Sequence, residues 1–315
     1  MKLEDKEFIQ TWERLQSAGE MAKETKVSVR WVMARRRLIE RRYNIKLEPK
    51  NKKGNYYSTG GAYPSKLDLG IRNGTVLVFS DAHFWPGIRT TAFRGLLWAI
   101  KELNPVAVIN NGDAFDGASI SRHPRIMWQH VPTVIDELKA CQSALSEIES
   151  IVKENCKLIW ALGNHDARFE SRLANGAPEY ERVMGFRLTD HFIRWQPMWS
   201  VWLNDQVVVK HRFKGGIHAT HTNTLWSGKT IVTGHLHSLK VTPFSDYGGT
   251  RFGVDTGTLA DPEGPQFRDY TEENPLNWRS GFAVLTLVDG KLLWPELVHR
   301  FADDVIEFRG KLINV

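Results

Sequence analysis

The chain has 315 residues, of which 42% are apolar, and its formal net charge at pH 7 is +6. This length and apolar content predict one large catalytic domain plus a small one, and they argue against a disordered chain. The two cysteines, Cys141 and Cys156, are too few for a disulfide framework, which favours a reducing compartment. The N-terminus is charged from Lys2, and no apolar run approaches the roughly 18 residues of a membrane span. We therefore expect a cytoplasmic protein without a membrane partner.

The positive charge is concentrated at the front of the chain. Residues 1–53 contain 15 Lys and Arg against 8 Asp and Glu, a net charge of +7, whereas the other 262 residues contain 27 against 28. Such an asymmetry predicts an anionic partner for the front segment. Nucleic acid is the partner that we expect.

The front segment has the residue pattern of three short helices. Phe8 and Trp12 share one face of a helix that begins near Asp5, and the run Ser17 to Glu20 is a capping box that starts a second helix. A third helix is predicted from a Ser cap at position 28 to a left-handed Asn at position 44. Its predicted buried side consists of Val29, Val32, Met33, Ile39 and Tyr43.

The opposite face of this third helix carries Arg30, Arg37 and Arg41 in one stripe. Three short helices whose last one is rich in arginine resemble a helix-turn-helix module, in which the final helix enters the major groove of DNA. The three arginines are therefore the predicted nucleic-acid contacts of a basic domain spanning residues 1–50. The alternative is a solvated basic helix that packs on the catalytic domain or binds a protein. Arg36 lies near the predicted core side and counts against a regular module.

Residues 51–74 are rich in Gly, Pro, Asn and Ser and predict a linker. From Thr75 onward, short apolar runs alternate with helical segments, and this order predicts a parallel sheet whose strands all end at one edge. The predicted strands are 75–80, 106–110 and 158–162, and the predicted helices are 90–103 and 132–153. A second set of strands is predicted at 201–203, 206–210, 230–233, 252–255 and 282–288. The expected fold of residues 75–315 is a two-sheet α/β sandwich with flanking helices.

Polar clusters follow five of these strands directly. They contain Asp81 and His83, Asp113 and Asp116, Asn164 to Asp166, His211, and finally His235 and His237. Asp, Asn and His together form the mixed oxygen and nitrogen set preferred by a borderline divalent metal. Glycines precede Asp113, Asn164 and His235, where they permit sharp turns and a close approach of the backbone.

The five clusters resemble the ordered signature of the calcineurin-like metallophosphoesterase superfamily, which is DxH, GD, GNH followed by an acid, a lone His, and GHxH. Every element is present in order across residues 81–237. The resemblance implies one divalent metal held by Asp81, His83 and His237. It implies a second held by Asn164, His211 and His235, with Asp113 bridging the two. Manganese is the expected ion, with Fe, Zn, Ni or Co as alternatives.

The resemblance also implies hydrolysis of a phosphoester by a hydroxide that bridges the two metals. His165 would protonate the leaving oxygen, and Asp166 would orient that imidazole or raise its pKa. Asp116 is expected to hydrogen-bond a ligand histidine. His218 and His221 follow His211 in the same loop and are alternatives to it as a ligand.

His123 and Arg168 are the predicted substrate contacts, because they lie just after two of the metal motifs, as do Arg125 and Arg172. For each of these residues alone, a surface charge is the alternative. Trp85 and Trp128 are predicted to stack on bases at the mouth of the site. The stretches SISRHPR and ARFESRL are similar to phage and prophage members of the superfamily, which often carry a helix-turn-helix in front.

The sequence therefore predicts a phage or prophage phosphoesterase with two metals that acts on phosphodiester or phosphomonoester bonds of nucleic acid. In that case the expected location is the host cytoplasm. One alternative is a phosphoprotein or small-molecule phosphatase whose basic front is an interaction arm. Another is a DNA-binding regulator with a vestigial enzyme domain, which the complete ligand set and His165 disfavour.

Overall fold

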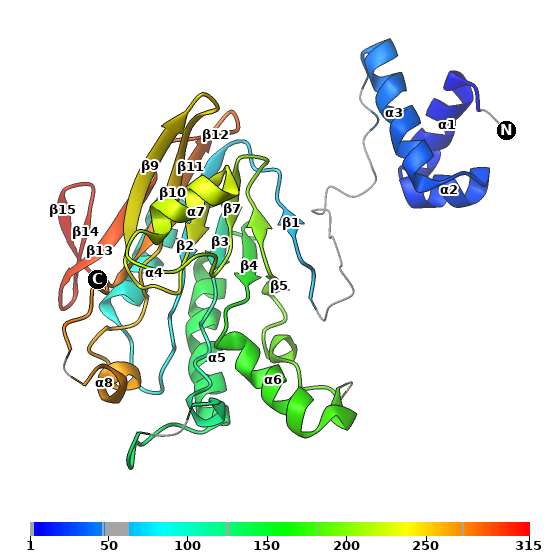
Figure 1. Cartoon of the computed structure of the whole chain (residues 1–315). Coiled ribbons are helices and arrows are strands. Elements are labelled where there is room, and N and C mark those ends of the chain that lie inside the picture. The colour runs from blue at the N-terminus through cyan, green and yellow to red at the C-terminus, as the bar shows by residue number, and fades with distance from the viewer. Residues whose placement is uncertain (1–2, 46, 48–62, 124–125, 182, 273) are drawn as a thin grey trace. The chain divides into compact units, whose positions relative to one another are not determined.

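The computed structural model describes residues 3–45, 47, 63–123, 126–181, 183–272 and 274–315 (Figure 1). The chain forms two compact units, Met1–Asn55 and Tyr56–Val315. None of the helices in the described ranges has both the length and the apolar character needed to cross a membrane.

The smaller unit contains the three expected helices, α1 (Asp5–Leu15), α2 (Ala18–Thr25) and α3 (Val29–Tyr43). Ser17 accepts a hydrogen bond from the backbone of Glu20, and Ser28 caps α3 in the same way. Asn44 ends α3 in the left-handed conformation, with a φ of 49°. The helices enclose a small apolar core made of Phe8, Trp12, Met21, Ala22, Val32, Ile39 and Leu47. Local capping signals therefore predict the starts of α2 and α3 and the end of α3.

The predicted buried side of α3 is partly wrong, because Val29 and Tyr43 are each 50% exposed. Arg36 takes part of that side instead, with its guanidinium 4.8 Å from the centre of the Trp12 ring. The Tyr43 hydroxyl lies 3.2 Å from Asp5 Oδ2, so this ring remains at the edge of the core with its polar end satisfied.

The larger unit is built on two sheets. The first contains, in order, β15 (Lys311–Asn314), β14 (Val305–Phe308), β13 (Glu296–Ala302), β11 (Gly281–Val288), β2 (Gly74–Phe79), β3 (Ala107–Asn110), β4 (Lys157–Ala161) and β5 (Gln196–Met198), with β12 (Lys291–Leu292) paired to β11. Strands β2, β3 and β4 are parallel, as expected, and β5, which was not predicted, adds to them in parallel. The assignment of residues 282–288 to the second set of strands is wrong, because β11 pairs antiparallel with β2. A strand that is apolar on both faces can enter either sheet, so its composition does not select one.

The second sheet contains, in order, β1 (Leu67–Asp68), β6 (Val201–Trp202), β7 (Val207–Val209), β8 (Thr230–Thr233), β10 (Gly249–Asp255) and β9 (Lys240–Asp246). Strand β1 lies inside the predicted linker, which is therefore wrong at this point. Leu67 pairs with Val201 and is 1% exposed, because its side chain contributes to the core between the sheets. Residues 51–62 of the predicted linker lie outside the described residues.

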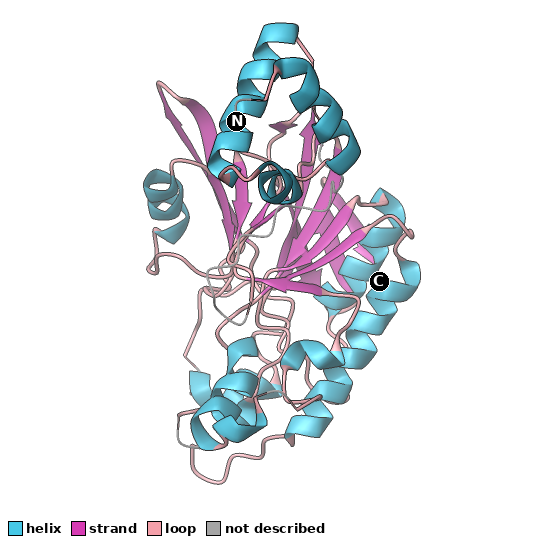
Figure 2. Ribbon diagram, turned by 90° about the vertical axis from the view of Figure 1, so that its right-hand side faces the viewer, coloured by secondary structure: helices cyan, strands magenta, loops and turns pink. Residues whose placement is uncertain are grey.

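The two sheets stack, and helices cover their outer faces (Figure 2). Side chains alternate along β2, so that Val76 and Val78 face the second sheet whereas Leu77 and Phe79 face the helices. The helices are α4 (Thr91–Leu103), α5 (Val134–Ile151), α6 (Asp166–Gly176), α7 (Ala219–Ser227) and α8 (Pro265–Thr271), with 3-10 turns at Ala118–Ile120, Pro178–Tyr180 and Leu188–His191. Both cysteines are buried and unpaired. The predicted two-sheet α/β sandwich is confirmed.

The loops that follow β2, β3, β4, β7 and β8 meet at one edge of the sandwich. Asp81 N donates to Gly112 O over 2.8 Å, which joins the loops after β2 and β3. His235 N donates to Asp81 Oδ2 over 2.8 Å, which joins a loop of the second sheet to a loop of the first. Polar residues from both sheets are thereby brought into one site.

Candidate metal centre and active site

Five of the seven predicted metal ligands have left-handed backbone conformations. The φ angles are 51° at Asp81, 39° at His83, 56° at Asp113, 72° at His235 and 55° at His237. Residues other than glycine rarely adopt these angles, and the strain is tolerated where surrounding contacts impose it, often at functional sites. The fold therefore holds these side chains in place at a cost in local backbone energy.

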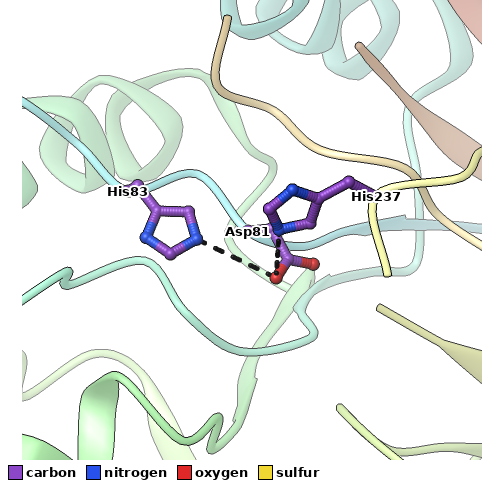
Figure 3. Close-up of side chains that lie close together, drawn as sticks. All are labelled: Asp81, His83 and His237. Atoms are coloured by element: carbon purple, nitrogen blue, oxygen red, sulfur yellow. Dashed lines mark ion pairs between the residues drawn. The ribbon is translucent and has the colours of Figure 1, made fainter. Parts of the chain in front are cut away.

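The first cluster consists of Asp81, His83 and His237 (Figure 3). His237 Nε2 lies 3.1 Å from Asp81 Oδ1, and His83 Nε2 lies 4.0 Å from the same oxygen. Burial alone would raise the pKa of Asp81, but the neighbouring His237 and His211 lower it by a larger amount, so that the net pKa is about 2. Two buried imidazole nitrogens thus converge on a carboxylate that stays ionised.

The second cluster consists of Asp113, His211 and His235, with Asn164 lining the same cavity. His211 Nε2 lies 3.0 Å from Asp113 Oδ2. Asp113 also forms a group with His83, a member of the first cluster, and so lies between the two sets of donors. This is the position that a shared ligand requires.

The structure brings His211, and neither of its two alternatives, to this cluster. His211 is buried, and its Nδ1 lies 2.7 Å from the Asn111 carbonyl, which turns Nε2 toward Asp113. His218 and His221 are both exposed, and His221 packs against Phe244. Burial alone would lower the pKa of His211, but the charges of Asp113 and Asp81 raise it to about 10.

The unsatisfied atoms of this site test whether these residues fit metal ions. Asn164 Oδ1 is buried and has no hydrogen-bond partner in the part of the chain that the structure describes. Asp81 Oδ1 and His211 Nε2 are close to opposite charges but lack the alignment of a hydrogen bond. Buried polar atoms are normally satisfied, and four imidazoles with carboxylate and amide oxygens suit borderline divalent cations. The donor set fits two such ions.

Two glycines allow the loops to approach closely. A Cβ at Gly163 would overlap Asp113 Oδ1, and a Cβ at Gly234 would overlap Ser80 Oγ. Any side chain at either position would push apart the loops that carry the donors.

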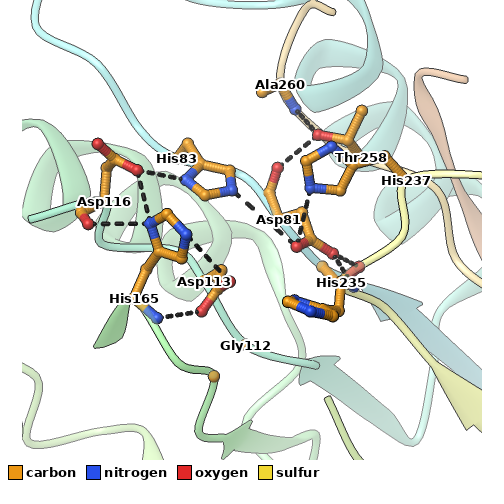
Figure 4. A network of polar contacts seen from close by, with 12 residues as sticks. Asp81, His83, Gly112, Asp113, Asp116, His165, His235, His237, Thr258 and Ala260 are labelled. Atoms are coloured by element: carbon orange, nitrogen blue, oxygen red, sulfur yellow. Dashed lines mark hydrogen bonds and ion pairs between the residues drawn. The ribbon is translucent and has the colours of Figure 1, made fainter. Parts of the chain in front are cut away.

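Asp116 holds His165 in place (Figure 4). His165 Nδ1 lies 2.8 Å from Asp116 Oδ1 and 3.1 Å from the Asp116 carbonyl oxygen. His83 Nδ1 lies 2.8 Å from the same Oδ1, as expected for an acid beside a ligand histidine. One carboxylate oxygen therefore orients a histidine of the metal cluster and the predicted general acid together.

The expectation that Asp166 orients His165 is wrong. Asp166 is the first residue of α6 and is 1% exposed. Its Oδ2 accepts hydrogen bonds from Asp113 N at 2.8 Å, Gly163 N at 2.8 Å and Trp160 Nε1 at 2.9 Å. Asp166 Oδ1 accepts a fourth bond, from Phe115 N. Because α6 begins at Asp166, its carboxylate lies next to the loops that follow β3 and β4 and accepts hydrogen bonds from their backbone N–H groups.

Arg168 contacts the predicted general acid directly. Its Nη2 lies 3.1 Å from His165 Nε2, and its Nη1 donates to the Asp116 carbonyl over 3.0 Å. Burial lowers the pKa of His165, but the charge of Asp113 and the hydrogen bond to Asp116 give a net increase. His165 also groups with His83 and Asp113, so a role as a metal ligand is the alternative.

The two clusters open into one cavity of about 710 Å³. His123, Arg168 and Trp85 line it, as expected of substrate contacts. Trp128 does not line it and is fully exposed, at 101%, so its predicted place at the mouth is wrong. Trp128 stands on the loop between Ile120 and α5 rather than at a strand end. Arg125 lies outside the described residues.

Several residues of the site carry no recognisable signal in the sequence. Arg122, Arg212, Phe267 and Trp278 also line the cavity, and the Trp278 ring centre lies 4.4 Å from that of the His237 imidazole. Phe267 and Trp278 occur outside the motifs, whereas Arg122 lies in the stretch SISRHPR and Arg212 follows His211, but no pattern marks either arginine as a lining residue.

Glu137 of α5 is a further residue without a sequence signal. It is buried and accepts hydrogen bonds from Gly117 N at 2.7 Å and Ala118 N at 3.0 Å. Burial and the nearby charge of Asp116 raise its pKa to about 7. Glu137 thereby holds the turn that follows Asp116, although in the sequence it is one acid among several on the helix.

In the other unit, Arg30, Arg37 and Arg41 are exposed on α3, as predicted. They make no ion pair with any described residue, whereas Arg35 and Arg42 of the same helix pair with Asp5. The exposed stripe is therefore electrostatically available to an anionic partner.

Comparisons with known proteins identify the family of the larger unit. A sequence model of calcineurin-like phosphoesterases matches residues 74–254, a range that contains all seven predicted ligands. The Gene 54 protein of Mycobacterium phage L5 is 24% identical over 249 residues, which are 71% of this chain and 92% of that protein. Zinc-bound Vps29 from Entamoeba histolytica is 12% identical over 76% of this chain and 98% of that chain, with a TM-score of 0.40. An archaeal phosphodiesterase is 14% identical over 71% of this chain and 99% of that chain, with a TM-score of 0.36.

Proposed function

The chain belongs to the calcineurin-like phosphoesterase family, and we propose that it is a phosphodiesterase with two metal ions that cleaves nucleic acid. The observation that carries this proposal is the pair of donor clusters in one arginine-lined cavity, with Asp113 close to His83 of the first cluster and to His211 and His235 of the second. Cations and arginines around one cavity complement the negative charge of a phosphodiester.

The first ion would be held by Asp81, His83 and His237, the second by Asn164, His211 and His235, and Asp113 would be shared. When bound, two such ions act as Lewis acids toward a phosphoryl group and lower the pKa of coordinated water. We propose manganese as the ion in use, because the four imidazoles disfavour Mg²⁺.

His165 acts as the proton donor to the leaving oxygen. Asp116 holds its Nδ1, which leaves Nε2 free to face the cavity. Arg168 contacts that Nε2 in the free protein. A phosphate oxygen is a stronger acceptor for the guanidinium, so substrate binding would draw Arg168 away, and the freed Nε2 would take up a proton from solvent that it then donates to the leaving oxygen.

The smaller unit would bring the enzyme to DNA through Arg30, Arg37 and Arg41, in the manner of a helix-turn-helix module. Their exposure and lack of acidic partners among the described residues support this role. The similarity to the Gene 54 protein supports the proposal that the chain is phage or prophage encoded.

Purified protein reconstituted with Mn²⁺ tests the function on linear DNA, circular single-stranded DNA, bis-p-nitrophenyl phosphate and p-nitrophenyl phosphate in parallel. The proposal expects hydrolysis of the diester and of at least one DNA. Hydrolysis of the monoester alone would favour the phosphatase alternative. Full metal loading without any hydrolysis would favour a DNA-binding regulator with a vestigial enzyme domain.

A further inference from the structure

We propose that a second, arginine-lined cavity beside the metal centre binds a phosphate group next to the scissile one. The inference rests on the proposed function and narrows its substrate to molecules with at least two phosphates. We call this space the arginine cavity and define it by Arg122, Arg168, Arg172 and Arg212.

The arginine cavity has a volume of about 700 Å³ and is continuous with the catalytic cavity. The two spaces share five lining residues, which are Arg122, His123, Asn164, Arg168 and Arg212. Asn164 is a predicted metal ligand, so a molecule held at the metal centre can extend directly into the arginine cavity. Among the described residues that line it there is no Asp or Glu.

One face of α6 forms a wall of this cavity. Arg168, Ser171, Arg172 and Asn175 line it, and their spacing of three and four places them on the same side of a helix. Phe169 is buried on the opposite side, in the core of the larger unit. Packing of that side therefore fixes which side chains α6 presents to the cavity.

The cavity arginines lack the acidic partners that other arginines of this unit have. Arg122, Arg172 and Arg212 are exposed and make no ion pair with any residue that the structure describes. By contrast, Arg94 pairs with Asp304 and Arg309 pairs with Glu296. Four guanidinium groups around one space, without a carboxylate to neutralise them, attract an anion with several oxygens.

The shared chemistry is a second phosphate, and it can come from two sources. In a nucleic acid, a nucleoside separates the two phosphates, whereas in a nucleoside polyphosphate an anhydride joins them. The catalytic cavity is also lined by the half-buried side chains of Trp85 and Trp278, and aromatic rings of this kind can stack on a base. We therefore expect the nucleic-acid spacing to bind more tightly.

Calorimetry on the full chain with Mn²⁺ tests this by comparing thymidine 3′,5′-bisphosphate, thymidine 5′-diphosphate and thymidine 5′-monophosphate. The bisphosphate should bind about tenfold more tightly than the monophosphate, the scale of one charge-assisted hydrogen bond. Arg172→Ala and Arg172→Glu should each remove most of this difference while binding of the monophosphate stays within about twofold, because Arg172 lines the arginine cavity and not the catalytic cavity. Arg72→Ala is the matched control, because Arg72 is exposed beyond the N-terminal end of β2, opposite the site.

Equal affinity for the bisphosphate and the monophosphate would overturn the inference, as would variants that weaken both equally. A preference for the diphosphate over the bisphosphate would keep the second phosphate site but assign it to polyphosphates. Hydrolysis of the p-nitrophenyl ester of thymidine 5′-monophosphate, with and without a 3′-phosphate, separates the two proposals. If the ester is not hydrolysed but the bisphosphate still binds more tightly than the monophosphate, the proposed enzymatic function is wrong and the second phosphate site stands. If the ester is hydrolysed but the 3′-phosphate has no effect on binding or rate, the enzymatic function stands and the second phosphate site is wrong.

Discussion

His165 Nδ1 lies 2.8 Å from Asp116 Oδ1, although the two residues are 49 positions apart. The acid that follows His165 in the chain points elsewhere, so Asp116 sets the orientation of this imidazole. If His165 is the general acid, His165→Ala should keep both metals and slow esters with poor leaving groups by about 100-fold or more. Hydrolysis of p-nitrophenyl esters should change far less, because nitrophenolate leaves without a proton.

Steady-state rates on a DNA oligonucleotide and on bis-p-nitrophenyl phosphate measure this difference, with metal analysis of the same preparations. His130→Ala, at an exposed position, is the control. Loss of a metal from His165→Ala would make His165 a ligand, and an equal loss on both ester types would make it structural.

Asp113→Asn should abolish hydrolysis and lower the bound metal below about two ions per chain, because a carboxylate shared by two cations cannot be replaced by a neutral amide. Metal content by mass spectrometry and turnover of bis-p-nitrophenyl phosphate measure both effects. Asp205→Asn, at an exposed position, should change neither. Normal turnover with unchanged metal content in Asp113→Asn would show that Asp113 is not a metal ligand.

His211→Ala should lose one of the two metals, whereas His218→Ala should keep both. The reason is that His211 is buried with Nε2 3.0 Å from Asp113 Oδ2, while His218 is exposed. Titration with Mn²⁺ followed by calorimetry counts the sites in each variant. If His218→Ala lacks one Mn²⁺ site and His211→Ala keeps both, His218 is the metal ligand and His211 is not.

Asp166→Ala should destabilise the larger unit by about 3 kcal/mol or more, because it leaves four donors without their acceptor, among them Trp160 Nε1. Unfolding in urea, followed by tryptophan fluorescence, measures the shift of the midpoint. Asp205→Ala should shift it by no more than about 0.5 kcal/mol. If Asp166→Ala unfolds at the wild-type midpoint yet loses activity, the carboxylate acts in catalysis.

Deletion of residues 1–50 should leave hydrolysis of bis-p-nitrophenyl phosphate intact, because all seven predicted ligands follow in the larger unit. The truncated chain should bind DNA more weakly, and the slope of log affinity against log salt should fall by about 0.9 for each DNA phosphate that the smaller unit neutralises in the full chain. Fluorescence anisotropy with labelled DNA at several salt concentrations measures both quantities.

Charge reversal of Arg30, Arg37 and Arg41 together should reproduce the binding defect without unfolding the unit, since all three are exposed. Arg14 is exposed on α1 and pairs with Glu24, so Arg14→Glu is a control for one charge reversal, to be compared with reversal of each of the three arginines singly. Binding and cleavage of DNA by the truncated chain at wild-type levels would refute the helix-turn-helix role and favour a protein partner.

Features that depend on neighbouring residues could be predicted from the sequence. Ser17 and Ser28 cap their helices because a cap needs only a backbone donor three residues further on. The motifs from Asp81 to His237 could be placed at strand ends, because alternating strands and helices bring the ends of parallel strands to one edge. The family resemblance then assigned ligand roles to residues that the loops do bring together.

Features that depend on distant segments could not be predicted. Strand β11 is apolar on both faces, and only its pairing with β2 places it in the first sheet. Asp116 and Asp166 are both acids beside metal motifs, and nothing local distinguishes the one that orients His165 from the one that fastens the loops. The arginine cavity joins side chains from three separate segments, around Arg122, Arg172 and Arg212. Hydrogen bonds and charge clusters of this kind form only after the core has packed, so their partners are set by the three-dimensional arrangement of the chain and not by its local pattern.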